Sequence, residues 1–94
     1  MCWTYVLWSD KLQKRYVGST VRALDERLTE HNDKRTRFTS GGVPWVLIHA
    51  EWYATLSEAR NRERYLKTGA GRKWLDERVR GNGDVIGGIE GSEP

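Results

Sequence analysis

The apolar residues near the start of the chain follow the pattern of two β-strands separated by a turn. Residues 3–8 are aromatic and β-branched, residues 9–11 read Ser-Asp-Lys, and residues 15–19 resume the strand pattern. This arrangement predicts a β-hairpin. Residues 45–53, which follow Pro44, are also β-rich and more continuously apolar, and they predict a third, largely buried strand.

A helical period begins after the hairpin. Val21, Leu24 and Leu28 recur at the three- and four-residue spacing of one helix face, and acidic residues follow early in the segment. Either residue of the pair 19–20, a serine and a threonine, is suited to cap the N-terminus. These features predict a first helix that runs from Val21 to about Asn32.

Two more helices are expected after the third strand. Thr55 and Glu58 have the spacing of a capping box, so a second helix is predicted to begin there and to end near Gly69. Gly71 is predicted to mark a break before a short third helix over residues 72–80. The polar and basic residues 33–42 are expected to form a loop.

The predicted elements define one small α+β domain with the order β-β-α-β-α-α. Residues 1–80 contain all of them, and neither a repeat nor a second domain is visible. Residues 81–94 carry five glycines and three acids without an apolar pattern, so this tail is predicted to be disordered.

Charge divides along the same boundary. The 16 Lys and Arg all lie in residues 1–80 beside 10 acids, a net charge of +6, while the tail carries −3. A basic body favours a polyanionic partner such as nucleic acid. Cys2 is the one cysteine, which fits a reducing, cytoplasmic compartment, and no apolar run approaches the roughly 20 residues of a membrane span.

Glu63 stands out because it interrupts the apolar stripe Leu56, Ala59 and Leu66 of the predicted second helix. A carboxylate in such a position is usually paired, protonated or bound to a metal, because burial of an unpaired charge is costly. Taken alone, an ion pair with Arg60 or Lys67, one helical turn away, is the more ordinary explanation.

His31 extends the apolar face of the first helix, and Arg27 lies one turn before it. Such a pair can contact a phosphate and transfer a proton, although a core histidine bonded to the backbone is the simpler alternative. Tyr5 and Tyr16 fall on adjacent hairpin strands, where paired aromatic residues are also ordinary packing. The cysteine and the two histidines have no close zinc-binding spacing.

These residues form an ordered set: Thr4-Tyr5-Val6, then Tyr16-Val17-Gly18 eleven residues after Tyr5, then Arg27, His31 and Glu63. The set resembles the GIY-YIG nuclease superfamily. It is most similar to small stand-alone members related to the nuclease domain of the excision-repair incision subunit. The resemblance covers about residues 3–78. Trp3 and Thr4 replace the Gly and Ile of the name motif, but Tyr5 keeps the phenol.

The resemblance implies a three-stranded antiparallel sheet flanked by helices, and a metal-dependent endonuclease that hydrolyses phosphodiester bonds. By the same resemblance, Glu63 binds one Mg²⁺ or Mn²⁺ ion, which oxygen ligands suit. Tyr5 acts as general base, with its pKa lowered by nearby cations, and His31 assists or replaces it. Arg27 holds the non-bridging phosphate oxygens, and Tyr16 positions water or phosphate.

The expected partner is nucleic acid, DNA in particular, and the relation to excision repair suggests a role in DNA repair. Cleavage should be structure-specific or weakly sequence-specific, because no separate DNA-reading motif is present. Basic residues expected to hold the backbone are Lys14, Arg15, Arg35, Arg37, Lys67, Arg72 and Lys73. The alternatives are a catalytically weak nucleic-acid-binding module of the same fold and a protein-interaction domain that uses the tryptophans.

Overall fold

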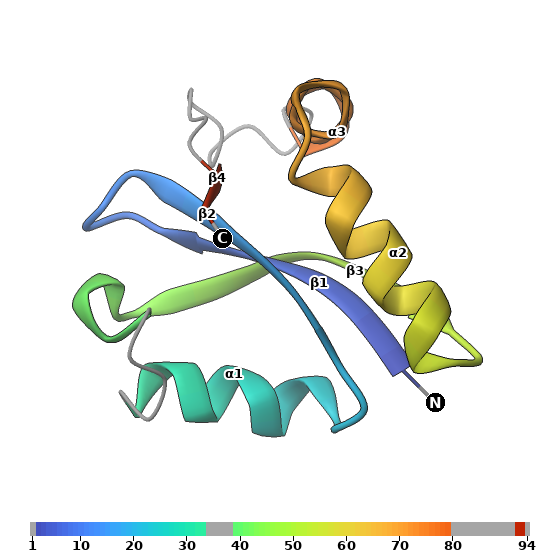
Figure 1. The fold of residues 1–94 in the computed structure, drawn as a ribbon. Coiled ribbons are helices and arrows are strands. Elements are labelled where there is room, and N and C mark those ends of the chain that lie inside the picture. The colour runs from blue at the N-terminus through green and yellow to red at the C-terminus, as the bar shows by residue number, and fades with distance from the viewer. Residues whose placement is uncertain (1, 34–38, 80–91, 94) are drawn as a thin grey trace.

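The computed structural model describes residues 2–33, 39–79 and 92–93, which form a small α+β fold (Figure 1). Up to the third α-helix, the predicted order β-β-α-β-α-α is confirmed. The elements are β1 (Cys2–Ser9), β2 (Lys14–Thr20), α1 (Leu24–Asn32), the 3₁₀ turn η1 (Ser40–Gly42), β3 (Trp45–Tyr53), α2 (Leu56–Leu66), α3 (Gly69–Val79) and β4 (Ser92–Glu93).

The sheet has the strand order β3-β1-β2-β4. β1 pairs antiparallel with both β2 and β3, so the predicted three-stranded antiparallel sheet is confirmed. β4 adds a short parallel pairing in which Ser92 lies opposite Arg15 and Glu93 lies opposite Tyr16. Apart from β4, the predicted disordered tail lies outside the described residues.

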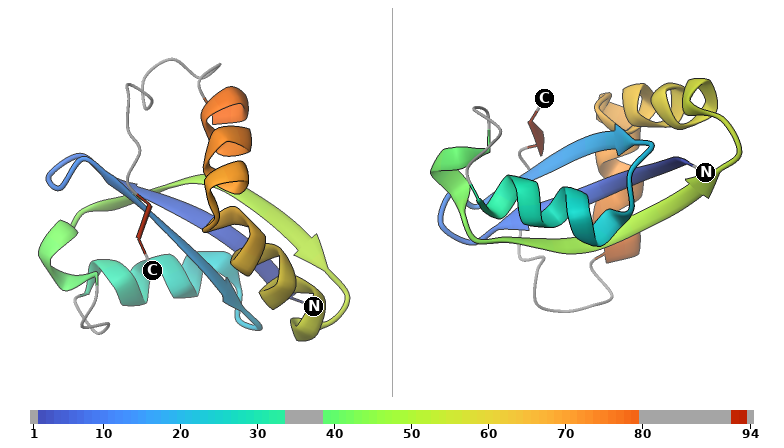
Figure 2. Two further views of the ribbon diagram at one scale, coloured as in Figure 1. Left: turned by 45° about the horizontal axis from the view of Figure 1, so that its top comes forward. Right: turned by 90° about the horizontal axis from the view of Figure 1, so that it is seen from below.

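Helices cover both faces of the sheet, with α1 on one face and with α2 and α3 on the other (Figures 1 and 2). Because strand side chains alternate between faces, β1 contributes to both layers. The Tyr5 hydroxyl contacts His31 of α1, whereas the Thr4 hydroxyl donates to the Ala59 carbonyl of α2 at 2.7 Å. β1 is therefore the central strand of the core.

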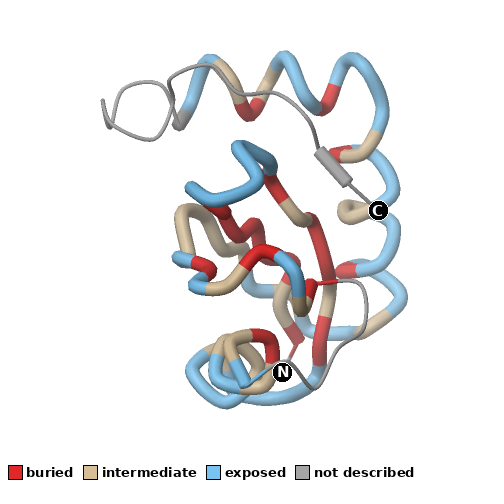
Figure 3. The backbone as a smooth tube through the Cα atoms, turned by 90° about the vertical axis from the view of Figure 1, so that its left-hand side faces the viewer, coloured by how far each residue is buried: buried red, intermediate tan, exposed pale blue. Residues whose placement is uncertain are grey.

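The main apolar core lies between the sheet and the α2–α3 layer. Its fully buried members come from two strands and two helices and are Val6, Val17, Leu66 and Leu75. The partly buried side chains of Ile48 and Trp74 pack against them. Burial of a side chain of this size stabilises the fold by roughly 1.5–3 kcal/mol. Figure 3 shows the buried positions gathered on the strands and on the inward side of the helices.

Gly71 lies inside α3, which begins at Gly69, so the predicted break at Gly71 is wrong. A Cβ at position 71 would lie 2.1 Å from the Tyr65 carbonyl oxygen and 2.5 Å from the Cα of Leu66. The glycine therefore lets the first turn of α3 approach the end of α2. Gly71 thus indicates a close contact between two helices instead of a helix break, and close approach of backbones is another common use of glycine.

The first helix begins later than predicted, at Leu24, with Ala23 in an extended conformation and no side-chain cap. The Thr20 hydroxyl accepts a hydrogen bond from the Arg22 backbone N–H at 2.9 Å, which stabilises a turn in place of the helix. Val21 is consequently outside the helix and 60% exposed. The predictions of a start at Val21 and of a cap at residues 19–20 are both wrong.

The third strand has the predicted bounds, but the prediction that it is largely buried is wrong. β3 is an edge strand of the sheet, and most of its residues are only half-buried. Val46 and Trp52 are each 54% exposed. The continuously buried strand is β1, because it has neighbours on both sides and helices on both faces.

The capping box at the start of α2 is confirmed. The Glu58 backbone N–H donates to the Thr55 hydroxyl, and the Thr55 N–H donates to the Glu58 carboxylate. Within residues 2–33, 39–79 and 92–93, none of the helices has the length and apolar character that crossing a membrane requires.

Candidate active site

The hairpin places two tyrosines and a glycine on the face of the sheet that α1 covers. Tyr5 lies opposite Gly18, and Leu7 lies opposite Tyr16. A Cβ at position 18 would lie 2.7 Å from the Tyr5 hydroxyl oxygen, so only a glycine leaves room for the Tyr5 ring. The Tyr16 ring lies beside it, with the ring centroids 6.3 Å apart. The eleven-residue spacing between Tyr5 and Tyr16 thus places the two rings side by side on neighbouring strands.

α1 brings Arg27 and His31 to the tyrosines from one helix face. The Arg27 Nε donates to the Tyr5 hydroxyl oxygen at 3.2 Å, and that oxygen is 3.0 Å from the His31 Nε2. On its other side, the His31 Nδ1 is 2.8 Å from the Thr39 Oγ1. The His31 and Tyr16 ring centroids are 5.0 Å apart. Four of the five predicted catalytic residues are therefore in one cluster.

The direction of these hydrogen bonds follows from the charge of His31. Burial, and then the charge of Arg27, lower the pKa of His31 to about 4, so the ring is neutral near pH 7. A neutral imidazole has one donor and one acceptor. Because the Tyr5 oxygen already accepts from Arg27, its O–H is free to donate to Nε2, and the Nδ1–H then donates to Thr39. The chain of hydrogen bonds runs from Arg27 through Tyr5 and His31 to Thr39.

The pKa of Tyr5 shifts in the opposite direction to the one predicted. Burial, with a further contribution from Tyr16, raises the pKa of Tyr5 to about 12, and the hydrogen bond and charge of Arg27 offset this only in part. Burial also raises the pKa of Tyr16. Tyr5 is 1% exposed, so desolvation of the phenolate outweighs one neighbouring cation.

Arg27 is held from two sides. Its Nη1 donates to the Glu30 Oε1 at 2.8 Å, while its Nε bonds to Tyr5. Glu30 also pairs with Arg22 through its second carboxylate oxygen. The Arg27 side chain is 26% exposed, so the guanidinium is fixed in place and still reaches solvent.

Glu63 reaches the cluster from α2, on the other side of β2. The Ser19 hydroxyl donates to its Oε1 at 2.5 Å, and the Lys67 Nζ donates to its Oε2 at 2.7 Å. Its side chain is 22% exposed, so the prediction that Glu63 lies in the buried seam is wrong; the seam consists of Ala59 and Leu66. After burial, which is the main cause, the negative charge of Glu63 also raises the pKa of both Tyr5 and Tyr16.

Two open clefts flank this carboxylate, and their walls are rich in arginine. One is lined by Ser19, Thr20, Val21, Arg22, Arg27, Leu56 and Arg60. The other is lined by Arg60, Glu63, Arg64 and Lys67. Arg60 belongs to both, so the clefts are neighbours. A phosphate backbone placed in them would lie between Arg27 and Glu63, among the cations that recognise phosphate.

The residues predicted to bind nucleic acid have different environments. Lys14, Arg72 and Lys73 are exposed, and Lys67 is half-buried against Glu63. Arg15 is 3% exposed, and its Nη1 lies 2.9 Å from the Asp76 carboxylate in α3. The prediction for Arg15 is wrong, because its side chain points into the layer between the sheet and α3. Two others, Arg35 and Arg37, lie outside the described residues.

Sequence reasoning missed Arg22, Arg60, Arg64 and Ser19. A usable signal was present for two of them, because Arg60 and Arg64 are four residues apart and share a helix face with Glu63 and Lys67. Ser19 and Arg22 carried no such signal, since their positions depend on where the first helix begins.

The chemistry of the Glu63 environment fits a divalent cation. A carboxylate and the neighbouring Ser19 hydroxyl are hard oxygen donors that open onto the two clefts. Across the described ranges, His, Cys, Asp and Glu do not form groups of three that could hold a metal ion. A single carboxylate completed by water and a substrate phosphate is the arrangement that suits Mg²⁺.

Two tyrosines in edge-to-face contact, an arginine and a histidine form one cluster on the antiparallel sheet, and a separate carboxylate lies on α2. The family model of the GIY-YIG catalytic domain matches residues 1–74. The chain belongs to this family, and the resemblance that its motifs indicated is confirmed. Neither a curated protein nor a solved structure gives a significant match to the chain.

Proposed function

We propose that the protein is a metal-dependent endonuclease that hydrolyses phosphodiester bonds in nucleic acid, with DNA as substrate. The observation that carries this proposal is the hydrogen-bonded chain Arg27–Tyr5–His31, because Arg27 lines a cleft that shares Arg60 with the cleft of the Glu63 carboxylate. A base, a phosphate-binding cation and a metal-binding carboxylate are the groups that this hydrolysis requires.

Tyr5 acts as base only if its own proton has somewhere to go. At alkaline pH that proton passes to bulk solvent, and the phenolate oxygen then takes a proton from the attacking water. The His31 Nε2, 3.0 Å away, accepts the phenol hydrogen bond and orients the oxygen, but its pKa of about 4 makes it too weak a base to hold the proton. The charge of Arg27 stabilises the phenolate. His31 bonds to the Tyr5 oxygen through Nε2 and to Thr39 through Nδ1, so it acts through Tyr5 by fixing the direction of the phenol.

The remaining groups bind and orient the phosphate. The exposed part of the Arg27 guanidinium is placed to hold the non-bridging oxygens as the new bond to phosphorus forms. Tyr16, next to Tyr5 and half-buried, orients the water or the phosphate. Glu63 would hold the divalent cation, which would supply positive charge near the leaving oxygen.

Arg22, Arg60 and Arg64 hold the backbone in the clefts on each side of Glu63. Such contacts to phosphate give affinity without sequence readout. Structure-specific or weakly sequence-specific cleavage, of the kind used in DNA repair, follows from this arrangement.

The test is incubation of the purified protein with supercoiled plasmid and with branched DNA in Mg²⁺, Mn²⁺ or EDTA. Cleavage is expected in the presence of either metal and not in EDTA. Glu63→Gln should reduce cleavage at least 100-fold, and Tyr5→Phe should reduce it by a similar factor. Glu77→Gln, an exposed carboxylate of α3, is the matched control and should cleave normally. Full metal-dependent cleavage by Glu63→Gln would remove the metal assignment.

A nucleic-acid-binding module without turnover is the second candidate. It is favoured by the raised pKa of Tyr5 and by the ion pair that already occupies Glu63. In that case DNA would bind with the expected salt dependence, but no metal ion would support cleavage of plasmid or branched substrates.

A further inference from the structure

Lys67 occupies the carboxylate oxygen that a metal ion at Glu63 would need. Its Nζ lies 2.7 Å from the Glu63 Oε2, while the Ser19 hydroxyl holds the Oε1. Both partners are half-buried, with side chains 32% and 22% exposed. The ammonium group and a divalent cation therefore compete for one oxygen.

The backbone of Lys67 is fixed, but its side chain is free to move. Its N–H donates to the carbonyls of Glu63 and Arg64 at the end of α2, and its own carbonyl accepts from Arg72. Within the part of the chain that the structure describes, the ammonium group of Lys67 pairs with the Glu63 carboxylate. A change of partner thus requires rotation of one flexible side chain and no change in the fold.

The place to which Lys67 can turn is the site itself. It lines a cleft with Arg60, Glu63 and Arg64, and its charge lowers the pKa of Tyr16 against the raising effect of burial. An ammonium group released from Glu63 therefore remains in the cleft proposed for the phosphate backbone. There it becomes an additional phosphate contact.

We propose that Lys67 is an exchangeable counter-ion: it neutralises Glu63 in the metal-free protein, and metal binding transfers it to a substrate phosphate. This inference rests on the proposed function. It adds that metal and nucleic acid bind cooperatively, because the metal releases a cation for the nucleic acid and the phosphate stabilises that cation away from the metal.

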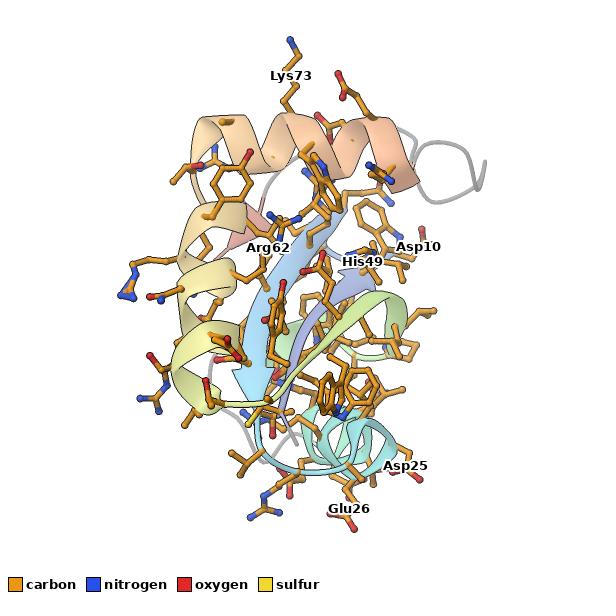
Figure 4. All side chains as sticks on the ribbon, turned by 90° about the vertical axis from the view of Figure 1, so that its right-hand side faces the viewer. Asp10, Asp25, Glu26, His49, Arg62 and Lys73 are labelled. Atoms are coloured by element: carbon orange, nitrogen blue, oxygen red, sulfur yellow. The ribbon has the colours of Figure 1, made fainter. Side chains whose placement is uncertain are left out.

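The first test measures Mn²⁺ binding without nucleic acid, by the loss of the free-ion signal in electron paramagnetic resonance. Lys67→Met keeps the aliphatic stem but removes the competitor, so the Kd for Mn²⁺ should fall about three- to tenfold. Lys67→Arg should stay close to wild type. Lys73→Met removes the same charge from an exposed position of α3, where the side chain points outward (Figure 4), and is the control for net charge in this measurement without nucleic acid.

The second test measures DNA binding at several salt concentrations, in EDTA and in Ca²⁺. Each phosphate contact contributes about 0.9 to the slope of log K against log salt for duplex DNA. Lys67→Met should lower this slope by about one in Ca²⁺ and leave it unchanged in EDTA, where Lys67 is held by Glu63. Thermal unfolding of each variant checks that the fold is kept.

Two results would overturn the exchange: an unchanged Mn²⁺ Kd in Lys67→Met, or an equal loss of slope in EDTA and Ca²⁺. Glu63→Gln separates this failure from failure of the proposed function. If Glu63→Gln abolishes Mn²⁺ binding while Lys67→Met has no effect, the metal site stands and only the exchange is wrong. If Glu63→Gln binds Mn²⁺ as tightly as wild type, the metal site itself is wrong.

Discussion

His31 shows how burial sets the chemistry of a single residue. The sequence placed it one turn from Arg27, but its partners on the sheet side, Tyr5 and Thr39, come from distant parts of the chain. Complete burial and the nearby guanidinium keep the ring neutral, and a neutral ring accepts a hydrogen bond from the phenol. The tautomer of His31, and with it the direction of the Tyr5 O–H, depends on the hydrogen bond to Thr39.

The lowered pKa of His31 makes stability depend on pH. A group whose folded pKa is about 4 but whose unfolded value is 6.5 binds more protons in the unfolded chain between these values. Stability is therefore complete above pH 6.5 and is lost as the pH falls toward 4. The loss is on the order of 3 kcal/mol for a shift of this size, at 1.36 kcal/mol per pKa unit.

Urea unfolding at pH 7.5, 6.0 and 4.5 measures this loss. The variant His31→Gln keeps a donor and an acceptor but cannot titrate, so its stability should change less with pH than that of wild type. The lowered pKa of Glu51 also costs stability on acidification, but equally in both proteins. Parallel curves for wild type and His31→Gln would contradict the assignment.

At the scale of the elements, the site depends on close approaches that only glycine permits. Gly18 makes room for the Tyr5 ring between two strands, and Gly71 makes room for α3 against the end of α2. The second contact positions Leu75 in the core next to Leu66. Since α2 carries Glu63, packing between the two helices supports the site indirectly.

Gly71→Ala should destabilise the protein by about 1–3 kcal/mol, because the new Cβ would meet the Tyr65 carbonyl oxygen at 2.1 Å and α3 must move away. Gly69→Ala is the matched control in the same helix, where an added Cβ meets nothing within 4 Å. It should be neutral or slightly stabilising. The two variants are compared by urea unfolding, and equal stabilities would show that the contact between α2 and α3 is not tight.

At the scale of the whole molecule, what could be predicted from the sequence was local. The strands and helices follow from the period of apolar residues, and Tyr5, Tyr16, Arg27, His31 and Glu63 follow from motif spacing, both of which are properties of short segments. The environment of each residue depends on tertiary pairing and could not be obtained in this way. Three results illustrate the difference.

Arg15 was expected to hold the nucleic-acid backbone because it is a basic residue of the hairpin, but α3 folds over it and supplies Asp76. The pKa of Tyr5 was expected to fall because cations were expected near it, but burial of the ring outweighs the effect of Arg27. The alternative for Glu63, an ion pair with Lys67, and its assignment as metal ligand were treated as exclusive. The structure contains the ion pair at a carboxylate that still opens onto a cleft, so the two roles are compatible.

The charge division between body and tail gives the last prediction. Truncation after Arg80 removes Asp84, Glu90 and Glu93 and raises the net charge from +3 to +6. The described part of the tail, β4, is two residues long and pairs with Arg15 and Tyr16 of β2. The melting temperature should therefore change by no more than a few degrees.

Nucleic-acid binding should respond more strongly than stability does. Loss of three negative charges strengthens attraction to phosphate, so the truncated protein should bind DNA more tightly at low salt. The gain should shrink above 0.1 M salt, where the Debye length is about 10 Å or less.

The matched control is the full chain with Asp84→Asn, Glu90→Gln and Glu93→Gln, which changes the charge by the same amount and keeps β4. Equal gains in the two proteins would assign the effect to charge alone. A larger gain on truncation would mean that β4, which pairs at Tyr16, also obstructs the site. A fall in affinity, or a melting temperature lowered by 10 degrees or more, would show instead that the tail is part of the folded domain.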